Sequence, residues 1–165
     1  MKIFLISEDK LKTETTINDN IDSLYLHSAI ELAQYIGLRE LIGCELHDKL
    51  CSLVADGSIS NLENKKYKEL LDEYVTPYLK YKVCSEITLP LAYKYRNSGV
   101  VQTNNEHEVN TAMKDAQTLK SYYEEKANFF GLALTSYLKQ HNFLEYPNYD
   151  SCSKIARGYQ TNIVL

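Results

Sequence analysis

Apolar residues recur at intervals of three and four through residues 106–141, a run that contains no proline and a single glycine, Gly131. This spacing is the period of an amphipathic α-helix, so it predicts one long helix. Such a helix would reach roughly 50 Å at about 1.5 Å per residue, more than a compact domain of this size needs. We expect part of it to pack on another chain; the alternative is a core helix of a monomer. The expected buried stripe is Val109, Ala112, Ala116, Leu119, Tyr123, Ala127, Phe130, Leu134 and Tyr137.

Two further helical stripes lie in the first third of the chain. Asn20 or Asp19 is the expected cap of the first helix, and Gly37 either ends it or marks a tight junction. The second helix is predicted over residues 38–55, where Gly43 weakens it by roughly 1 kcal/mol relative to alanine. A turn at residues 56–58 follows. The expected buried residues are Ile21, Leu24, Tyr25, Ala29, Leu32, Tyr35 and Ile36, then Leu38, Leu41, Ile42, Leu46, Leu50, Leu53 and Val54.

The N-terminal region is short and mixed. Its apolar residues 2–6 predict either a short strand or an extended arm that docks on the helices. Ser7 is placed to cap a helical turn that continues to Leu11, because its side chain can accept a hydrogen bond from a free backbone N–H. Residues 13–18 are polar and β-branched, which predicts a loop.

Residues 61–95 keep a helical spacing that two prolines interrupt, Pro77 and Pro90. Because proline removes a backbone donor and clashes with the preceding turn, we expect a break or a strong kink at Pro77. The alternative is that Thr76 caps a new helix with Pro77 as its first residue. The apolar positions are Tyr67, Leu70, Leu71, Tyr74, Tyr78 and Leu79.

Residues 97–99 stop the helix, and the β-prone residues Val100 and Val101 follow. They predict a short strand or the edge of a hairpin that projects from the bundle and contacts other subunits. The patterns together predict an all-α fold. We expect a small helical bundle with one long helix in its C-terminal half, a short β-hairpin near residues 97–105 and an extended C-terminal tail.

Periodicity ends after His141, so we divide the chain into a helical domain, residues 1–141, and an extended arm, residues 142–165. The arm is rich in aromatic and β-branched residues, unlike a disordered tail. It either lies across its own domain as a strap or orders on a neighbouring protein. On a neighbour, its aromatic residues would fill pockets and its basic residues would meet acidic partners. The expected interface residues of hairpin and arm are Val100, Val101, Tyr146, Tyr149, Lys154, Arg157, Tyr159, Ile163, Val164 and Leu165.

Composition adds constraints on partners. Tyrosine (14 residues, against 4 Phe and no Trp) favours surfaces that a partner buries but leaves partly wet, although a tyrosine-rich private core fits as well. A net charge of −4 suggests no basic patch that would hold DNA by its phosphates. The four cysteines contain no C-x-x-C and favour reduced thiols in the cytoplasm. The apolar N-terminus is too short for a signal peptide or a membrane span.

Cys44, His47 and Cys51 share one helix face and form the candidate metal-ligand set. A structural zinc site needs a fourth ligand, which would have to come from Cys84 or Cys152. Helical cysteines and histidines are more often core or boundary residues, and we favour that interpretation. The chain has no G-x-S-x-G, phosphate loop, G-x-G-x-x-G or H-E-x-x-H. We therefore expect no enzyme activity, no metal and no cofactor.

Several segments then occur in a recognisable order: Phe4-Leu5-Ile6-Ser7, Asp9-Lys10-Leu11-Lys12, Ile30, Ala33-Gln34, Ile36, residues 41–50, residues 74–81 with Pro77, and residues 94–101. In this order the chain resembles the head–tail connector (adaptor) proteins of tailed bacteriophages. It is most similar to those of phages that infect gut Bacteroidetes, including the crAss-like ring proteins. The resemblance covers roughly residues 3–140 and rests on fold signatures.

The resemblance implies a structural virion protein without a cofactor, located at the head–tail interface of the portal vertex and assembled in the host bacterial cytoplasm. Copies would form a homo-oligomeric ring, expected to be dodecameric, beneath the portal protein. The ring would extend the DNA channel and contact tail or further ring proteins, and genomic DNA would pass through without sequence-specific binding. The rival interpretation is an intracellular helical scaffold or regulatory interaction module. A third is a metal-dependent enzyme built on Cys44 and His47.

Overall fold

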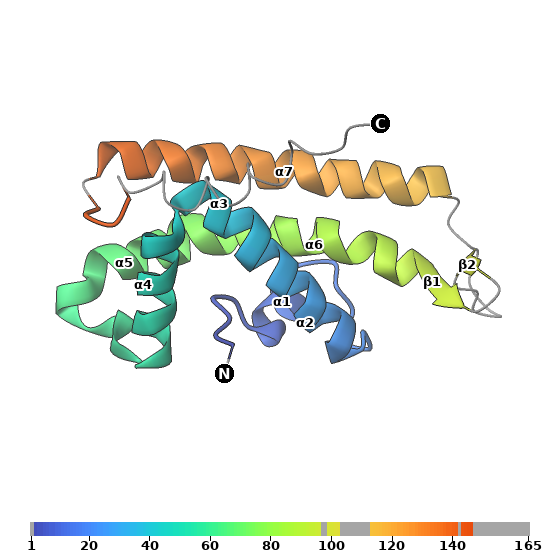
Figure 1. The fold of residues 1–165 in the computed structure, drawn as a ribbon, viewed down its shortest axis with the longest axis horizontal. Helices are drawn as coiled ribbons and strands as arrows, with labels where there is room; N and C mark the ends of the chain where they lie inside the picture. Colours follow the sequence, from blue (N-terminus) through green and yellow to red (C-terminus); the bar gives the residue numbers. More distant parts are fainter. Residues whose placement is uncertain (1, 97–98, 103–112, 142, 147–165) are drawn as a thin grey trace, which may run out of the picture.

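The computed structural model of the chain describes residues 2–96, 99–102, 113–141 and 143–146 (Figure 1). Two long helices, α6 (Thr76–Ala92) and α7 (Met113–Gln140), run antiparallel along each other through the length of the molecule. The N-terminal helices cross the opposite side of α6 (Figure 1). The long helix predicted over residues 106–141 is therefore confirmed over residues 113–140, and residues 106–112 lie outside the described part.

The N-terminal residues form an extended arm, one of the two predicted alternatives, and α1 (Glu8–Glu14) follows. The prediction that Ser7 caps this helix is confirmed, because its hydroxyl accepts a hydrogen bond from the Lys10 N–H. The predicted loop begins two residues late, since α1 includes Thr13 and Glu14. The cap of α2 (Ser23–Glu31) is Asp22, whose carboxylate accepts from the Leu24 N–H, so the prediction of Asn20 or Asp19 is wrong.

Of the two alternatives for Gly37, a helix end is wrong, whereas a tight junction agrees with its close approach to Tyr78. The chain stays helical from α2 through a π-helical segment, η1 (Leu32–Leu38), into α3 (Arg39–Ile42). It breaks instead at Gly43, whose φ of 83° and ψ of 162° are open to glycine and costly for other residues. A separate helix, α4 (Cys44–Ala55), starts there and turns in a new direction (Figure 1). Gly43 therefore acts as a breaker and does not merely weaken one continuous helix.

The buried face of α2 and η1 differs from the predicted stripe. Of that stripe only Ala29 is fully buried, whereas Leu24, Leu32 and Ile36 are exposed. Apolar residues occupy both sides of this stretch, so spacing alone supports more than one stripe. The residues that enter the core are Leu26, Ala29, Ile30, Ala33, Gln34 and Leu38.

Two short 3₁₀ segments, η2 (Ser58–Ser60) and η3 (Leu62–Asn64), lead into α5 (Lys65–Glu69). A second π-helical segment, η4 (Leu70–Val75), then joins α5 to α6 without a break. The predicted break at Pro77 is therefore wrong. Widened π turns are one way in which a helix accommodates an interrupted hydrogen-bond ladder, and η4 ends at Val75, two residues before this proline. The helix also continues past Pro90 to Ala92.

A short antiparallel hairpin lies at the end of α6 (Figure 1). Its strands are β1 (Tyr93–Arg96) and β2 (Gly99–Gln102), with Tyr95 opposite Val100 and Lys94 opposite Val101. The hairpin was predicted near residues 97–105, and only β2 falls in that range. The missed strand, β1, follows directly on a helix and carries no turn residue that would separate the two in the sequence.

Most tyrosines of α6 and η4 pack inside the protomer. Tyr74 stacks on Tyr137 with ring centroids 4.1 Å apart, and Tyr81 stacks on Phe130 at 5.3 Å. Aromatic pairs of this kind stabilise a packed core beyond the area that they bury. The tyrosine-rich private core, one of the two explanations of the composition, therefore accounts for these residues.

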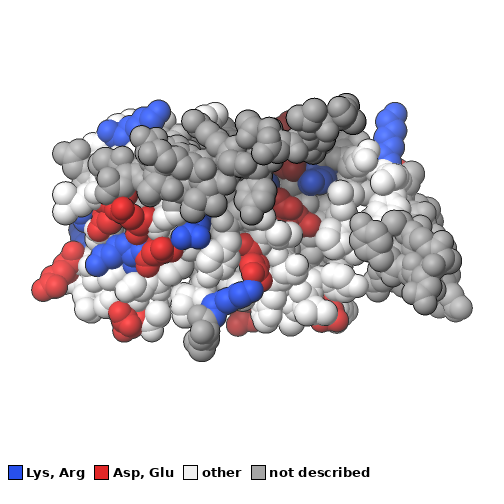
Figure 2. Space-filling model, viewed as in Figure 1, with Lys and Arg blue, Asp and Glu red and all other residues white. Residues whose placement is uncertain are grey.

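The all-α bundle with a long helix in its C-terminal half is thus confirmed. The core also extends past the expected domain boundary at residue 141, because Phe143 is buried and Tyr146 packs against the same cluster. Residues 147–165 of the expected arm lie outside the described part. On the face shown in Figure 2, acidic and basic side chains are interspersed, without a continuous basic patch among the described residues. None of the described helices has the length and apolarity that crossing a bilayer requires.

Candidate functional site

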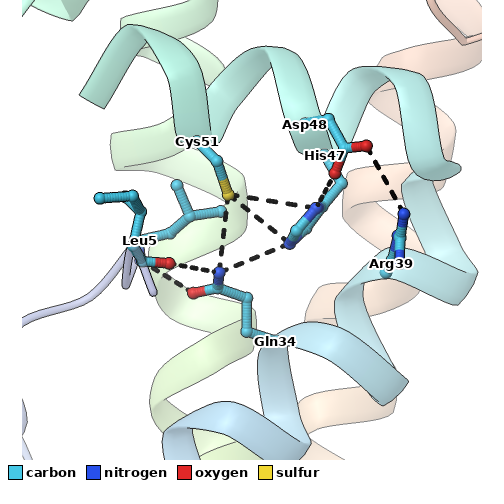
Figure 3. Close-up of polar contacts among 7 residues, drawn as sticks. Leu5, Gln34, Arg39, His47, Asp48 and Cys51 are labelled. Carbon is cyan, nitrogen blue, oxygen red and sulfur yellow. Dashed lines mark hydrogen bonds and ion pairs between the residues drawn. The ribbon is translucent and has the colours of Figure 1, made fainter. Parts of the chain in front are cut away.

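A buried polar cluster lies where the N-terminal arm crosses η1 and α4 (Figure 3). Gln34, fully buried, accepts a hydrogen bond from the Leu5 N–H and donates one to the Ile3 carbonyl, each at 2.8 Å. Its Nε2 atom also lies 3.4 Å from Nε2 of His47, which is buried as well. The Gln34 amide therefore satisfies two backbone groups of the arm and attaches it to the bundle.

The orientation of Gln34 determines which nitrogen of His47 carries the proton. Because the Gln34 Nε2 atom is a donor, Nε2 of His47 is the acceptor and its Nδ1–H donates to Asp48 Oδ1 at 2.9 Å. Burial lowers the pKa of His47, and the Asp48 carboxylate opposes that shift only in part. The imidazole is therefore held neutral inside the cluster.

Cys51 lies next to this histidine, with its sulfur 3.7 Å from the His47 Nε2 atom. Burial, and then the Asp48 carboxylate, raise the pKa of the Cys51 thiol to about 11. A thiol with this pKa is protonated at neutral pH, and the thiolate is the form that attacks electrophiles and binds metals. Cys51 is therefore a poor nucleophile in this setting.

The candidate metal-ligand set is not assembled. Cys44 is disulfide-bonded, whereas Cys51 and Cys84 are free thiols, so the expectation of reduced cysteines is wrong for Cys44. Within the described residues, no group of three or more His, Cys, Asp or Glu side chains is arranged to hold a metal ion. The polar cluster is thus suited to positioning the arm.

The lowered pKa of His47 predicts a pH-dependent stability. In the unfolded chain His47 binds a proton near the usual histidine pKa of about 6.5, whereas in the folded chain it binds one only at lower pH. Acid therefore favours unfolding. We expect the stability contribution to be complete above about pH 6.5 and to be lost as the pH falls toward the lower folded pKa, by at most about 1.4 kcal/mol per pH unit. The free energy of unfolding, measured with urea between about pH 7.5 and pH 5, should change less with pH in His47→Gln than in the wild type. An identical slope in both proteins would contradict this prediction.

A groove with a volume of about 750 Å³ opens between η1 and α3 on one side and α6 and α7 on the other. Its apolar walls include Leu32, Ile36 and Leu132, which are 39%, 63% and 70% exposed. The charged residues at the groove are Glu40, Lys82, Glu86 and Glu124. A groove with apolar walls and a charged rim can bind an extended peptide.

Two glycines let the helices that form the groove approach each other. A Cβ atom on Gly37 would lie 2.7 Å from the Tyr78 hydroxyl, and one on Gly131 would lie 3.3 Å from Leu41 Cδ1. Burial, and then the Glu40 and Glu86 carboxylates, raise the pKa of Tyr78, so its hydroxyl stays neutral. The floor of the groove is therefore uncharged and closely packed.

A second surface lies on the side of α7 that faces away from the core. Four apolar residues form this outer face: Leu119, Tyr122, Phe129 and Leu132, which are 45%, 50%, 67% and 70% exposed. Successive members are three or seven residues apart, so each lies within about 60° of the next around the helix, and the set winds across the outer side of α7 from Leu119 to Leu132. Leu132 belongs to both surfaces and connects the outer face to the groove.

The structure describes few of the predicted interface residues. Val100 and Val101 belong to strand β2 of the hairpin. Tyr146 is half-buried against its own core. The other predicted interface residues lie outside the described part: Tyr149, Lys154, Arg157, Tyr159, Ile163, Val164 and Leu165.

Both surfaces contain residues that sequence reasoning assigned to the core. Leu32 and Ile36 were expected in the buried stripe of the first long helix, and Leu119 in that of α7. The neighbouring residues Phe129 and Phe130 offered a signal, because adjacent helical side chains point about 100° apart and cannot share one face. Phe130 packs on Tyr81, and Phe129 projects outward.

Comparison with known proteins places the chain in a family. No curated protein and no solved structure matches it. Residues 38–159 match a family described as "Family of unknown function (DUF6712)". This match begins at the last residue of η1, so it includes α3, α6 and α7 but leaves out the groove residues Leu32, Ile36 and Gly37. It also covers most of the undescribed C-terminal segment. Because it spans most of the chain, the protein belongs to this family of unknown function, DUF6712.

Proposed function

We propose that this protein is a structural virion protein, a head–tail connector or adaptor that forms a ring beneath the portal. In this role it extends the DNA channel, joins capsid to tail, and contacts the portal and tail or further ring proteins. The proposal starts from the ordered sequence segments that resemble phage connectors. The observation that carries it is the outer face of α7, where four large apolar side chains remain in water.

An exposed apolar stripe is costly for a protein that works alone, and such surfaces mark contacts with other proteins. In a closed ring each subunit uses two different faces, because the contacts are heterologous. The outer face of α7 supplies one of them. The helix around residues 74–95 is not the second face on its aromatic side, because Tyr74 and Tyr81 pack on α7 within the same protomer. The hairpin that contains Val100 and Val101 remains a proposed contact along the ring or channel.

Replacing Phe129 with glutamate is expected to prevent ring formation. A charge at a buried aromatic contact removes a residue of the type that dominates interfaces, at a cost of about 2 kcal/mol or more, which weakens association roughly 30-fold. Electron microscopy of the purified protein, alone and mixed with its portal, would show rings for the wild type and none for the variant.

The matched control is Gln117→Glu, which adds the same charge at an exposed position of the same helix, away from the outer face. Circular dichroism should show equal helix content in all three proteins. Rings that form equally well with Phe129→Glu would remove the outer face from the proposal. A wild-type protein that neither forms rings nor binds the portal would instead favour the intracellular scaffold or regulatory module.

A further inference from the structure

The groove between η1, α3, α6 and α7 is an apolar surface without a partner among the described residues. Ile36 of η1 and Leu132 of α7 stand on opposite walls and leave most of their surface in water. A short apolar segment placed between them would bury both side chains. Because apolar area is more stable away from water, an occupant that covers both walls would stabilise the fold.

The cysteines identify a segment that can be held close to this groove. Cys44 is disulfide-bonded, whereas Cys51 and Cys84 are free thiols. The sequence contains one further cysteine, Cys152, which is therefore the partner that the chain itself leaves for Cys44. A disulfide holds the two Cα atoms about 6 Å apart.

Cys44 lies next to one wall of the groove. It is the first residue of α4 and follows Leu41, a groove residue of α3, by three positions. Three positions span at most about 11 Å between Cα atoms, so the disulfide would place the Cα atom of Cys152 within about 17 Å of that of Leu41. The residues that follow Cys152 can therefore enter the groove beside α3.

We propose that Cys44 pairs with Cys152 and that residues 153–165 lie in the groove of their own chain, as a strap between η1 and α7. This inference goes beyond the proposed connector function and does not depend on it, because every contact lies within one chain. The bond forms when the two thiols pass two electrons and two protons to a low-molecular-weight disulfide such as oxidised glutathione, which is released as two thiols.

The anchor that precedes the strap lies on the required side of the molecule. Phe143 packs on Tyr67, and Figure 1 places the last described residues at the same end of the molecule as α4 and α5. From Tyr146 to Cys152 the chain makes six steps, which span at most about 21 Å. The bond to Cys44 therefore requires a path along one end of the bundle only.

The strap itself is long enough for the groove. Its thirteen residues, 153–165, span at most about 45 Å when extended. The groove residues of α7 run from Glu124 to Thr135, which is eleven helical steps of about 1.5 Å, or roughly 16 Å. The strap can therefore follow the whole groove without being fully extended.

The composition of the strap suits apolar walls. Its apolar residues are Ile155, Ala156, Tyr159, Ile163, Val164 and Leu165. The charges at the groove are largely paired, because Lys82 lies 2.7 Å from Glu86 and Lys120 lies 3.5 Å from Glu124. Burial of apolar area is therefore the main attraction between strap and groove, and the disulfide keeps the strap close enough for that attraction to act.

Peptide mapping by mass spectrometry tests the covalent part of this inference. Full-length protein, an equal mixture of normal and ¹⁵N-labelled chains, is incubated with oxidised glutathione, alkylated under denaturing conditions and digested without reductant. We expect a peptide pair that joins Cys44 to Cys152 within single chains, with Cys51 and Cys84 alkylated. A Cys44 that is alkylated or carries glutathione, or pairs that join a light and a heavy chain, would overturn the inference.

Photo-crosslinking tests where the strap lies. With a photoreactive amino acid in place of Ile36, we expect cross-links to peptides of residues 153–165 within single chains. The same photoreactive amino acid at Leu24, which is 73% exposed and does not line the groove, should give no such product.

Opening the disulfide should weaken this cross-link. In Cys152→Ser the middle of the strap is tethered through about thirteen residues from Tyr146, whereas the disulfide tethers it through about seven. Effective concentration falls with roughly the −3/2 power of tether length, so the cross-link yield should fall about two- to threefold. Dithiothreitol should lower the wild-type yield to the same extent and leave that of Cys152→Ser unchanged.

Circular dichroism should show equal helix content in the wild type and Cys152→Ser, so that the yields can be compared. A Cys44–Cys152 bond without cross-links from position 36 would remove the strap from the groove. Equal cross-link yields in the wild type and Cys152→Ser would show that the disulfide does not hold the strap in place. Either result would overturn the inference.

Discussion

A chain that ends at residue 141 is expected to be about 3–5 kcal/mol less stable than a chain that ends at residue 146, when both are compared under reducing conditions that open the Cys44 disulfide. The reason is Phe143, which lies beyond the last helix and is only 3% exposed. Its ring meets Tyr67 edge-on at 5.6 Å and lies 6.2 Å from Tyr137. Removing a buried phenylalanine costs its burial energy and leaves a cavity.

A second contact is lost in the same truncation. The Tyr67 hydroxyl donates to Glu145, with its oxygen 2.9 and 3.1 Å from the two carboxylate oxygens. Burial, and then this hydrogen bond, raise the pKa of Tyr67 to about 12, so it stays a donor. Without residue 145, a mostly buried hydroxyl loses its charged partner. Since domains of this size are stable by only about 5–15 kcal/mol, the shorter chain should unfold readily.

Urea unfolding followed by circular dichroism measures the effect in chains ending at residues 141, 146 and 165. Phe143→Ala in the full-length protein should reproduce most of the loss. The matched control is Leu144→Ala, because the neighbouring Leu144 is 82% exposed and should be nearly neutral. Equal stability of the chains ending at 141 and 146 would show that Phe143 does not belong to the core.

Replacing Gln34 with leucine is expected to cost about 2–4 kcal/mol and to release the N-terminal arm. Leucine fills a similar volume but can neither accept from the Leu5 N–H nor donate to the Ile3 carbonyl. Leu5 is buried, so its unpaired N–H would bear the full desolvation penalty. The arm also contributes Leu5 and Ile6 to the core, and their packing would loosen with it.

Hydrogen exchange at the Leu5 amide, together with the urea midpoint, reports this effect. The amide should be protected in the wild type and exchange quickly in Gln34→Leu. The matched control, Gln140→Leu, makes the same chemical change at an exposed position of α7 and should alter neither measurement. A protected Leu5 amide in Gln34→Leu would mean that apolar packing alone holds the arm.

Features that depend on nearby residues could be predicted from the sequence. The period of three and four in residues 113–140 predicted α7, because a helix repeats its buried face at that interval regardless of what it packs against. Ser7 was recognised as a cap because the N–H that it binds lies three residues away. The turn at residues 56–58 was likewise readable from Gly57, which has a φ of 67°.

Only the tertiary structure decided which apolar side chains are buried and which form surfaces. Leu26 and Leu24 are both leucines on one helix, and the packing of α2 on α6 buries the first and exposes the second. The contacts of Gln34 with Leu5 and of Tyr67 with Glu145 join residues far apart in the chain, so no local spacing predicts them. The groove exists because four separate elements meet around Gly37 and Gly131. Local periodicity determined where this chain is helical, because helix hydrogen bonds span only a few residues, whereas its candidate surfaces arise from contacts between distant segments.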